Sequence, residues 1–222
     1  MSGARPVVLF DLDGTLVDSA ADIASACDAA LADLGLPPRG FDTVKGFIGQ
    51  GSERLMHRCL TGARDGIAPP ALFAPAYARF EAHYETNLLA HTRPYPGAVE
   101  TLDRLAAAGY ALGLVTNKPS RFTLPLLAGL DLARHFLLVR TGDRLPRKPD
   151  PAPLLDSAAA LGGVPASTTL VGDSAADIDA ARAAGMRILC VSFGYAQPGD
   201  LVRLAPDAVV DTLPALLALF AV

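Results

Sequence analysis

Two acidic residues directly follow an apolar run near the start of the chain. Residues 6–10 form the run, and Asp11 and Asp13 come after it. Side chains two positions apart at the end of a strand project to the same side, so both carboxylates would face the crevice beyond the carboxyl edge of a sheet. Gly14 would then allow a sharp turn. Two adjacent carboxylates repel each other and predict a bound cation, although a polar turn that caps a helix is the alternative.

A second acidic pair follows a later apolar run. Residues 168–172 lead into Asp173, and Asp177 lies four positions further along. The pair could be the N-cap and a first-turn acid of an ordinary helix, but at this spacing the two acids would also share one helix face. If this run neighbours the first in a sheet, three or four carboxylates converge. Oxygen ligands without a nearby His or Cys favour Mg²⁺ over zinc.

A hydroxyl, an amide and two lysines could bind a phosphate. Thr116 ends the apolar run of residues 111–116, and Asn117 follows it. Free backbone N–H groups at this point could complete a phosphate cradle. An ordinary turn is the alternative. The chain contains 16 Arg and only 3 Lys, so lysine is the rarer choice. Lys118 follows the cradle, and Lys148 precedes a helix that begins at a proline. A compact ammonium suits a point contact to a phosphoryl oxygen and to a carboxylate.

Short apolar runs and Ala/Leu-rich segments must position these residues. Strands are expected at residues 6–10, 111–116, 136–140, 168–172, 188–192 and 208–210, and helices at 97–108, 121–129, 151–161, 177–184 and 213–220. Strands that are apolar on both faces and alternate with single helices predict a parallel, doubly wound (Rossmann-like) α/β sheet.

The segment between the first two strands has a different pattern. It carries no convincing strand, and helical patterns cover residues 19–34, 42–48, 52–60 and 72–89, with Ser19 as an N-cap of the first. This predicts a helical cap domain at 17–91, inserted into an α/β core made of 1–16 and 92–222. Within the cap, Gly51, Lys45 and Arg54 are candidates for substrate contacts, although a helix joint and solvated surface charges are the alternatives.

The composition limits the class of protein. The chain has 222 residues, of which 51% are hydrophobic, which is enough for a sizeable core and excludes a disordered chain. A formal net charge of −4 makes nucleic acid or an anionic membrane an unexpected partner. No apolar run approaches the ~20 residues of a membrane span. Cys27, Cys59 and Cys190 lack metal-ligand spacing and cannot all pair, so a reducing, cytoplasmic setting is expected.

In chain order, these motifs resemble those of the haloacid dehalogenase superfamily. The matching residues are Asp11-Leu12-Asp13-Gly14-Thr15, then Thr116 with Asn117, then Lys148, and last Gly172-Asp173-Ser174-Ala175-Ala176-Asp177. The resemblance spans essentially the whole chain and includes a cap after the first motif. More narrowly, FDLDGTLVDS at 10–19, IGQG at 48–51, LVTNKP at 114–119 and VGDSAAD at 171–177 resemble bacterial phosphoglycolate phosphatases.

The resemblance implies a phosphatase that forms an aspartyl-phosphate intermediate. Asp11 would be the nucleophile, and Asp13 would protonate the leaving alkoxide and then activate water. Mg²⁺ would be held by the Asp11 carboxylate, the Asp13 backbone carbonyl and Asp173, with Asp177 as a further ligand or beside the ligands. Thr116, the Asn117 backbone and Lys148 would bind the phosphoryl oxygens. The implied substrate is 2-phosphoglycolate, a small phosphorylated metabolite, and the implied enzyme is a monomer or a homodimer.

The sequence leaves other functions open. A phosphatase for another small metabolite, such as a sugar phosphate, comes next, followed by a phosphosugar mutase resembling β-phosphoglucomutase. A dehalogenase is disfavoured because Asp13 would have no role in that reaction. A catalytically silent binding module of the same fold is the non-enzyme alternative, and the complete set of Asp11, Asp13, Lys148 and Asp173 counts against it.

Overall fold

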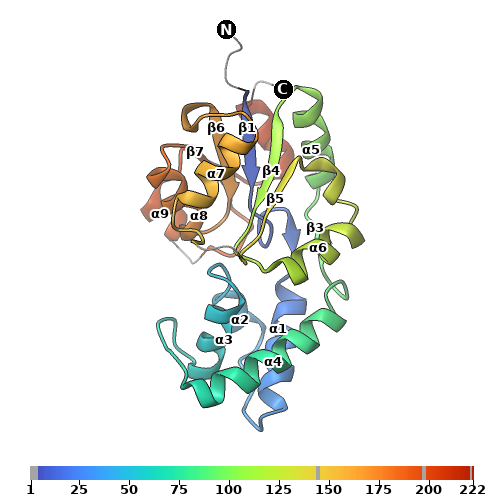
Figure 1. Ribbon diagram of the computed structural model, residues 1–222, viewed down its shortest axis with the longest axis vertical. Helices are drawn as coiled ribbons and strands as arrows, with labels where there is room; N and C mark the ends of the chain where they lie inside the picture. Colours follow the sequence, from blue (N-terminus) through green and yellow to red (C-terminus); the bar gives the residue numbers. More distant parts are fainter. Residues whose placement is uncertain (1–4, 144–145, 197–198, 221) are drawn as a thin grey trace.

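Six strands form one parallel sheet in the computed structural model, which describes residues 5–143, 146–196, 199–220 and 222. The strands are β1 Val7–Phe10, β4 Ala111–Val115, β5 Leu138–Arg140, β6 Thr168–Gly172, β7 Arg187–Val191 and β8 Ala208–Val210. Their order is β5-β4-β1-β6-β7-β8, and all neighbours run parallel. The predicted doubly wound α/β sheet is confirmed (Figure 1).

Strand β1 lies in the middle of the sheet, and this position explains why its sequence is apolar at successive residues instead of alternating between apolar and polar. All four of its residues are buried. Val7 and Leu9 belong to the apolar cluster on one face, and Val8 and Phe10 belong to the cluster on the other. A strand that is covered on both faces must be apolar at every position.

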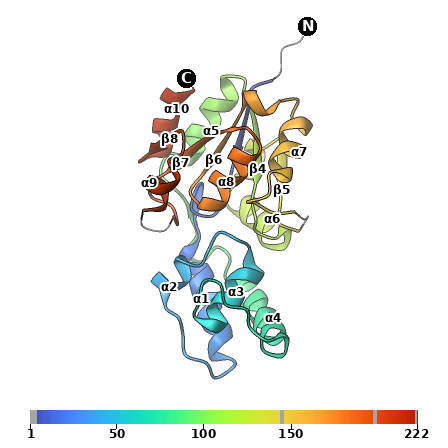
Figure 2. The ribbon, with the colours of Figure 1, turned by 90° about the vertical axis from the view of Figure 1, so that its left-hand side faces the viewer.

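Helices cover both faces of the sheet. They are α5 Ala98–Ala107, α6 Ser120–Gly129, α7 Ala152–Ala160, α8 Ala175–Ala183, α9 Asp200–Leu204 and α10 Leu216–Leu219, with short 3₁₀ turns η1 Ala133–His135, η2 Pro165–Ser167 and η3 Leu213–Ala215. Residues of α7 and α8 pack on the same face of the sheet as Val7, and residues of α5, α6 and α10 pack on the same face as Val8. Figures 1 and 2 show helices on both sides of the sheet. Helix α9 was not predicted, because five residues are too few to show a helical period.

Four further helices form a group beyond the edge of the sheet where β1 ends (Figures 1 and 2). They are α1 Ala20–Ala32, α2 Phe41–Lys45, α3 Ser52–Thr61 and α4 Pro70–Thr86. Helix α4 begins at Pro70, two residues before the predicted start, because proline is well suited to the first helical position. None of the described helices is both long and apolar enough to cross a membrane.

A two-stranded antiparallel pair joins the two connections between these helices and the sheet. Strand β2, Val17–Asp18, pairs with β3, Arg93–Pro94. Nearby, the buried carboxylate of Asp22 on α1 accepts hydrogen bonds from the backbone N–H groups of His91 and Thr92, and from the Thr92 hydroxyl at 2.7 Å. Strands of two residues have no alternation to detect, so the pair was not predicted. It lies beside the proposed domain boundaries, which stay a prediction.

Candidate active site

The loops that follow three neighbouring strands meet at one edge of the sheet. Asp11 follows β1, Thr116 follows β4 and Asp173 follows β6, and Phe10 of β1 pairs with Leu114 and with Val171. In an open α/β sheet, the crevice outside these carboxyl ends is the usual place for a ligand. A small cavity of about 50 Å³ lies there, between the sheet and the helical group. The polar residues that line it from the side of the sheet are Asp11, Asp13, Thr116, Asn117, Lys118 and Lys148.

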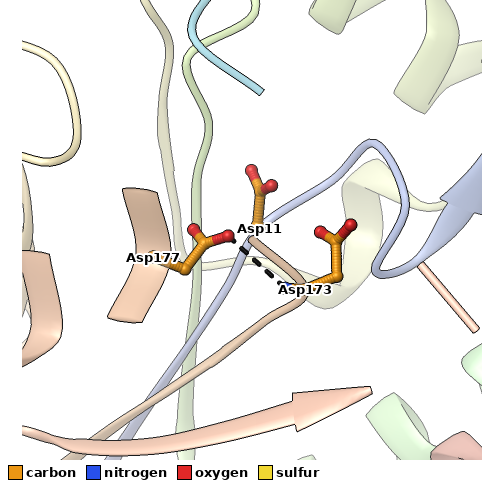
Figure 3. Close-up of side chains that lie close together, drawn as sticks. All are labelled: Asp11, Asp173 and Asp177. Carbon is orange, nitrogen blue, oxygen red and sulfur yellow. Dashed lines mark hydrogen bonds between the residues drawn. The ribbon is translucent and has the colours of Figure 1, made fainter. Parts of the chain in front are cut away.

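Three carboxylates form an acidic cluster beside this cavity. Oxygens of Asp11, Asp173 and Asp177 all lie within 4.8 Å of one another (Figure 3). Burial raises the pKa of Asp11 to about 6; Lys148 opposes this shift and Asp177 adds to it. Burial, and then the charges of Asp177 and Asp11, raise the pKa of Asp173 well above its usual value. A cation would offset this repulsion, and a donor set made only of oxygens fits a hard cation such as Mg²⁺.

Asp177 is the most heavily engaged of the three acids, because four donors hold its two oxygens whereas two donors hold those of Asp173. Its Oδ1 lies 2.7 Å from Nζ of Lys148. Its Oδ2 accepts hydrogen bonds from the hydroxyl and the backbone N–H group of Ser174. It also accepts one from the backbone N–H group of Asp173 (Figure 3). Ser174, rather than Asp173, is the N-cap of α8. Asp177 would therefore fit a place beside a bound cation better than it would fit direct ligation of one.

Lys148 is held at the centre of the site. Its Nζ lies 3.0 Å from Oδ1 of Asp11 and donates to the carbonyl of Val115 at 2.7 Å; its side chain is 2% exposed. Burial lowers the pKa of Lys148, but Asp11 and Asp177 raise it by more, so the net shift is upward and the ammonium stays charged. The side-chain amide of Asn117 fixes this loop, since it accepts from the Lys148 N–H and donates to the Lys148 carbonyl.

Asp13 has a different set of partners. Nζ of Lys118 lies 2.9 and 3.0 Å from its two carboxylate oxygens, and the Ser19 hydroxyl donates to Oδ1 at 2.5 Å. Ser19 is the N-cap residue of α1, as predicted, but its side chain makes no capping hydrogen bond, because its hydroxyl donates to Asp13. The sequence placed Lys118 only next to the cradle, and the rarity of lysine was the one signal that pointed to it.

Tyr195 is a site residue that no sequence motif indicated. Its backbone N–H donates to Oδ2 of Asp173 at 2.6 Å, and the Thr15 hydroxyl donates to Oδ1 at 2.9 Å. Gly14 has a φ of +86°, and a Cβ at this position would collide with Asp173 and Tyr195. Tyr195 lies beyond β7 and reaches Asp173 only through the fold.

The helical group supplies the roof of the cavity. The lining residues from this group are Ile23, Ile48, Gly49, Gly51, Ser52, Leu55, Phe80 and Tyr84. Gly51 precedes the first turn of α3. Lys45 and Arg54 are not among the described residues that line the cavity. The Lys45 ammonium lies over the Tyr195 ring, and the Arg54 guanidinium donates to the carbonyls of Gly66 and Arg64, so both cations are engaged elsewhere.

Both the sequence and the structure resemble proteins of one class. Residues 8–191 match the family model of haloacid dehalogenase-like hydrolases. The chain is 44% identical over 207 residues to a phosphoglycolate phosphatase from Thiobacillus denitrificans, and the match covers 93% of this chain and 91% of that protein. It is 42% identical over 208 residues to a phosphoglycolate phosphatase from Nitrosococcus oceani, and this match covers 93% of this chain and 92% of that protein. A crystal structure of a predicted phosphoglycolate phosphatase from Haemophilus somnus superimposes with a TM-score of 0.91 at 32% identity, covering 99% of this chain and 100% of that one.

Proposed function

Since the chain belongs to the haloacid dehalogenase-like hydrolases, we propose that it hydrolyses 2-phosphoglycolate to glycolate and phosphate with Mg²⁺ as its metal ion. Its relatives and its family make it a phosphoric monoester hydrolase. The finer proposal is carried by one observation: the Asp11 carboxylate, paired with a buried lysine inside an acidic cluster, borders a small roofed cavity that Asp13 also lines.

The proposed metal ligands are the Asp11 carboxylate, the Asp13 backbone carbonyl and Asp173, with Asp177 beside them. The raised pKa values of Asp11 and Asp173 support this set, because burial and then the charge of Asp177 disfavour the two carboxylate anions, and a cation would stabilise them. Bound Mg²⁺ supplies positive charge that lowers the repulsion between an anionic nucleophile and a phosphate dianion.

The reaction would proceed in two steps through Asp11. First, an Asp11 carboxylate oxygen attacks phosphorus, the bond from phosphorus to the ester oxygen breaks, and that oxygen takes a proton from Asp13. Thr116, the Asn117 backbone and Lys148 would bind the phosphoryl oxygens during this transfer. Then water attacks the phosphorus, its proton passes to Asp13, and the bond to Asp11 breaks to release phosphate. Asp13 thereby returns to its protonated state.

The residues of the roof favour a small substrate that carries a second negative charge beside its phosphate. Gly51 and Ser52, at the start of α3, line the cavity. Free N–H groups at a helix start, with the positive end of the helix dipole, would bind the carboxylate of 2-phosphoglycolate. Residues 17–91 would act as a cap that closes over the substrate and excludes water.

The proposed location is the cytoplasm. Cys27, Cys59 and Cys190 are all buried and none is in a disulfide, which fits a reducing compartment.

A substrate panel tests the proposed function. We would compare kcat/KM for 2-phosphoglycolate, ethyl phosphate, 3-phosphoglycerate and a hexose phosphate, each with Mg²⁺ and with excess EDTA. Ethyl phosphate is the matched control, because it lacks only the carboxylate. We expect 2-phosphoglycolate to exceed ethyl phosphate by about 100-fold and EDTA to abolish turnover. A preference for the hexose phosphate would contradict 2-phosphoglycolate as the substrate. Turnover in EDTA would contradict the requirement for a metal ion.

A further inference from the structure

A buried lysine connects Asp13 to the helical group. Lys118 follows β4, and its side chain is 5% exposed. Its Nζ lies 2.9 and 3.0 Å from the Asp13 carboxylate oxygens and donates to the phenol oxygen of Tyr84 at 2.5 Å. Tyr84 belongs to α4, the last helix of the proposed cap. One ammonium therefore contacts both a core carboxylate and a cap phenol.

Tyr84 is itself tightly held. Its ring centroid lies 4.7 Å from Nζ of Lys118, 5.5 Å from the Phe80 ring and 4.9 Å from the ring of Phe122 in the core. Burial, followed by the charges of Asp13 and Asp22, raises the pKa of Tyr84, so the phenol stays neutral. A neutral phenol and its ring face both stabilise a buried cation.

The cation in turn orients the carboxylate. A lysine side chain has four flexible bonds, and fixing its ammonium requires contacts from more than one side. Among the described residues, Nζ of Lys118 has hydrogen-bond partners only in Asp13 and Tyr84. If α4 moved away with the cap, the ammonium would lose the phenol and the ring together. The two Asp13 oxygens would then lose a fixed donor.

We propose that Lys118 and Tyr84 are positioning residues that hold the Asp13 carboxyl group in its reactive orientation only when the cap is closed. This inference rests on the proposed function, because it assumes that Asp13 transfers a proton to and from the reacting oxygens. Closure would then do more than exclude water: it would complete the arrangement that protonates the leaving group. Proton transfer would follow the arrival of a substrate small enough to let α4 approach the core.

A leaving-group comparison tests this role. An alkoxide such as glycolate needs a proton as it leaves, whereas 4-nitrophenolate leaves without one. We would measure phosphorylation of the enzyme in single turnovers by rapid quench, using 2-phosphoglycolate and 4-nitrophenyl phosphate. With 2-phosphoglycolate we expect about 100-fold slower phosphorylation for Lys118→Met and about tenfold for Tyr84→Phe, with both variants within about threefold of wild type on the aryl ester. Tyr84→Phe removes one oxygen and keeps the ring, so it preserves the test if Lys118→Met folds poorly.

Arg121→Gln is the matched control. Arg121 also joins the core to α4, through Glu81 at 2.6 Å and Glu85 at 2.7 Å, and it has no contact with Asp13. This variant would weaken closure and change both substrates by the same factor. Equal slowing of both substrates by Tyr84→Phe and Lys118→Met would overturn the inference, because it would assign them to closure alone. If wild type formed no phosphoenzyme from either ester, the proposed function would fail and the inference with it.

Discussion

The floor and the roof of the cavity are built in different ways. The floor consists of loops at adjacent strand ends, and its charges hold one another: Lys148 lies between Asp11 and Asp177 and is nearly inaccessible to solvent. The roof consists of helix ends, apolar side chains and a glycine turn. A rigid set of charges suits chemistry that is common to all phosphate monoesters. A roof of another composition can change the substrate without changing that chemistry.

Two contacts between the floor and the roof are partly exposed. Arg147 forms an ion pair with Glu53 of α3 at 2.9 Å, and the Asn117 side chain donates to the carbonyl of Gly49 at 3.1 Å. Exposed ion pairs contribute little to stability. Such contacts suit a part that must open. The contact of Lys118 with Tyr84 is buried, as are the hydrogen bonds from the Ser19 and Ala20 N–H groups to the Tyr195 hydroxyl.

The largest effect is expected from Asp11→Asn. The substitution keeps the volume and removes the attacking oxygen, so turnover should fall by about 10³-fold or more while the fold persists. Steady-state assays with 2-phosphoglycolate and 4-nitrophenyl phosphate, alongside circular dichroism, would check this. Activity above a few per cent on either ester would remove Asp11 from the role of nucleophile.

Lys148→Met should damage both activity and stability. It leaves the carboxylates of Asp11 and Asp177 without their buried cation, which costs about 3–5 kcal/mol of unfolding free energy. Urea unfolding would measure this loss. Arg140→Gln is the control, because its ion pair with Asp156 is partly exposed and should contribute about 1 kcal/mol at most. Similar losses of unfolding free energy in Lys148→Met and Arg140→Gln would contradict the claim that buried charges stabilise the floor.

Asp173→Asn should separate metal binding from the rest of the floor. The Mg²⁺ concentration for half-maximal activity should rise by about 10–100-fold or more, since removing even indirect support for a metal has effects of that size. Mg²⁺ should also raise the Tm of wild type and no longer raise that of the variant. Asp156→Asn, which removes an exposed acid on α7, is the control. An unchanged Mg²⁺ requirement in Asp173→Asn would exclude Asp173 as a ligand.

Gly51→Val should alter the roof and spare the floor. A Cβ at Gly51 would lie 3.3 Å from the Asn117 carbonyl oxygen, at a backbone φ of +86°. We expect kcat/KM for 2-phosphoglycolate to fall by about tenfold or more, and that for 4-nitrophenyl phosphate to change by less than about threefold. Gly40→Val is the matched control: Gly40 has a φ of +80°, precedes α2, and has open space around it. Equal losses on the two esters would mean that the turn serves only closure.

The smallest effect is expected from Glu53→Gln. It removes the exposed ion pair with Arg147, so kcat/KM should change by less than about fivefold and equally for both esters. A pH-independent change much larger than this, or one confined to 2-phosphoglycolate, would show that Glu53 contributes to substrate selection.

The floor could be predicted from the sequence because its residues stand at fixed positions relative to strand ends. The run before Asp11 is apolar at every position, and the run before Asp173 contains only threonine, aliphatic residues and glycine, with no charged residue. Both patterns mark central strands, and neighbouring central strands bring their carboxyl ends together. The role of Tyr195 could not be predicted, because its contact with Asp173 depends on how the fold brings the two segments together. The donor role of Ser19 could not be predicted either, because it depends on the turn that brings Ser19 back to Asp13. Only charge and position on cap helices favour Lys45 and Arg54 as substrate contacts, and neither property indicates which way a helix faces. Their contact with substrate stays a prediction.

The most direct test of the central claim, that the floor performs the chemistry through Asp11, is to trap the phosphorylated residue. Wild-type enzyme would be mixed with 2-phosphoglycolate and Mg²⁺, quenched in acid during the first turnover, and reduced with borohydride. This treatment converts a phosphorylated aspartate into homoserine, which peptide mass spectrometry locates. We predict homoserine at position 11, and none in Asp11→Asn. Continued turnover without modification at position 11, or modification at Asp13 instead, would contradict the account.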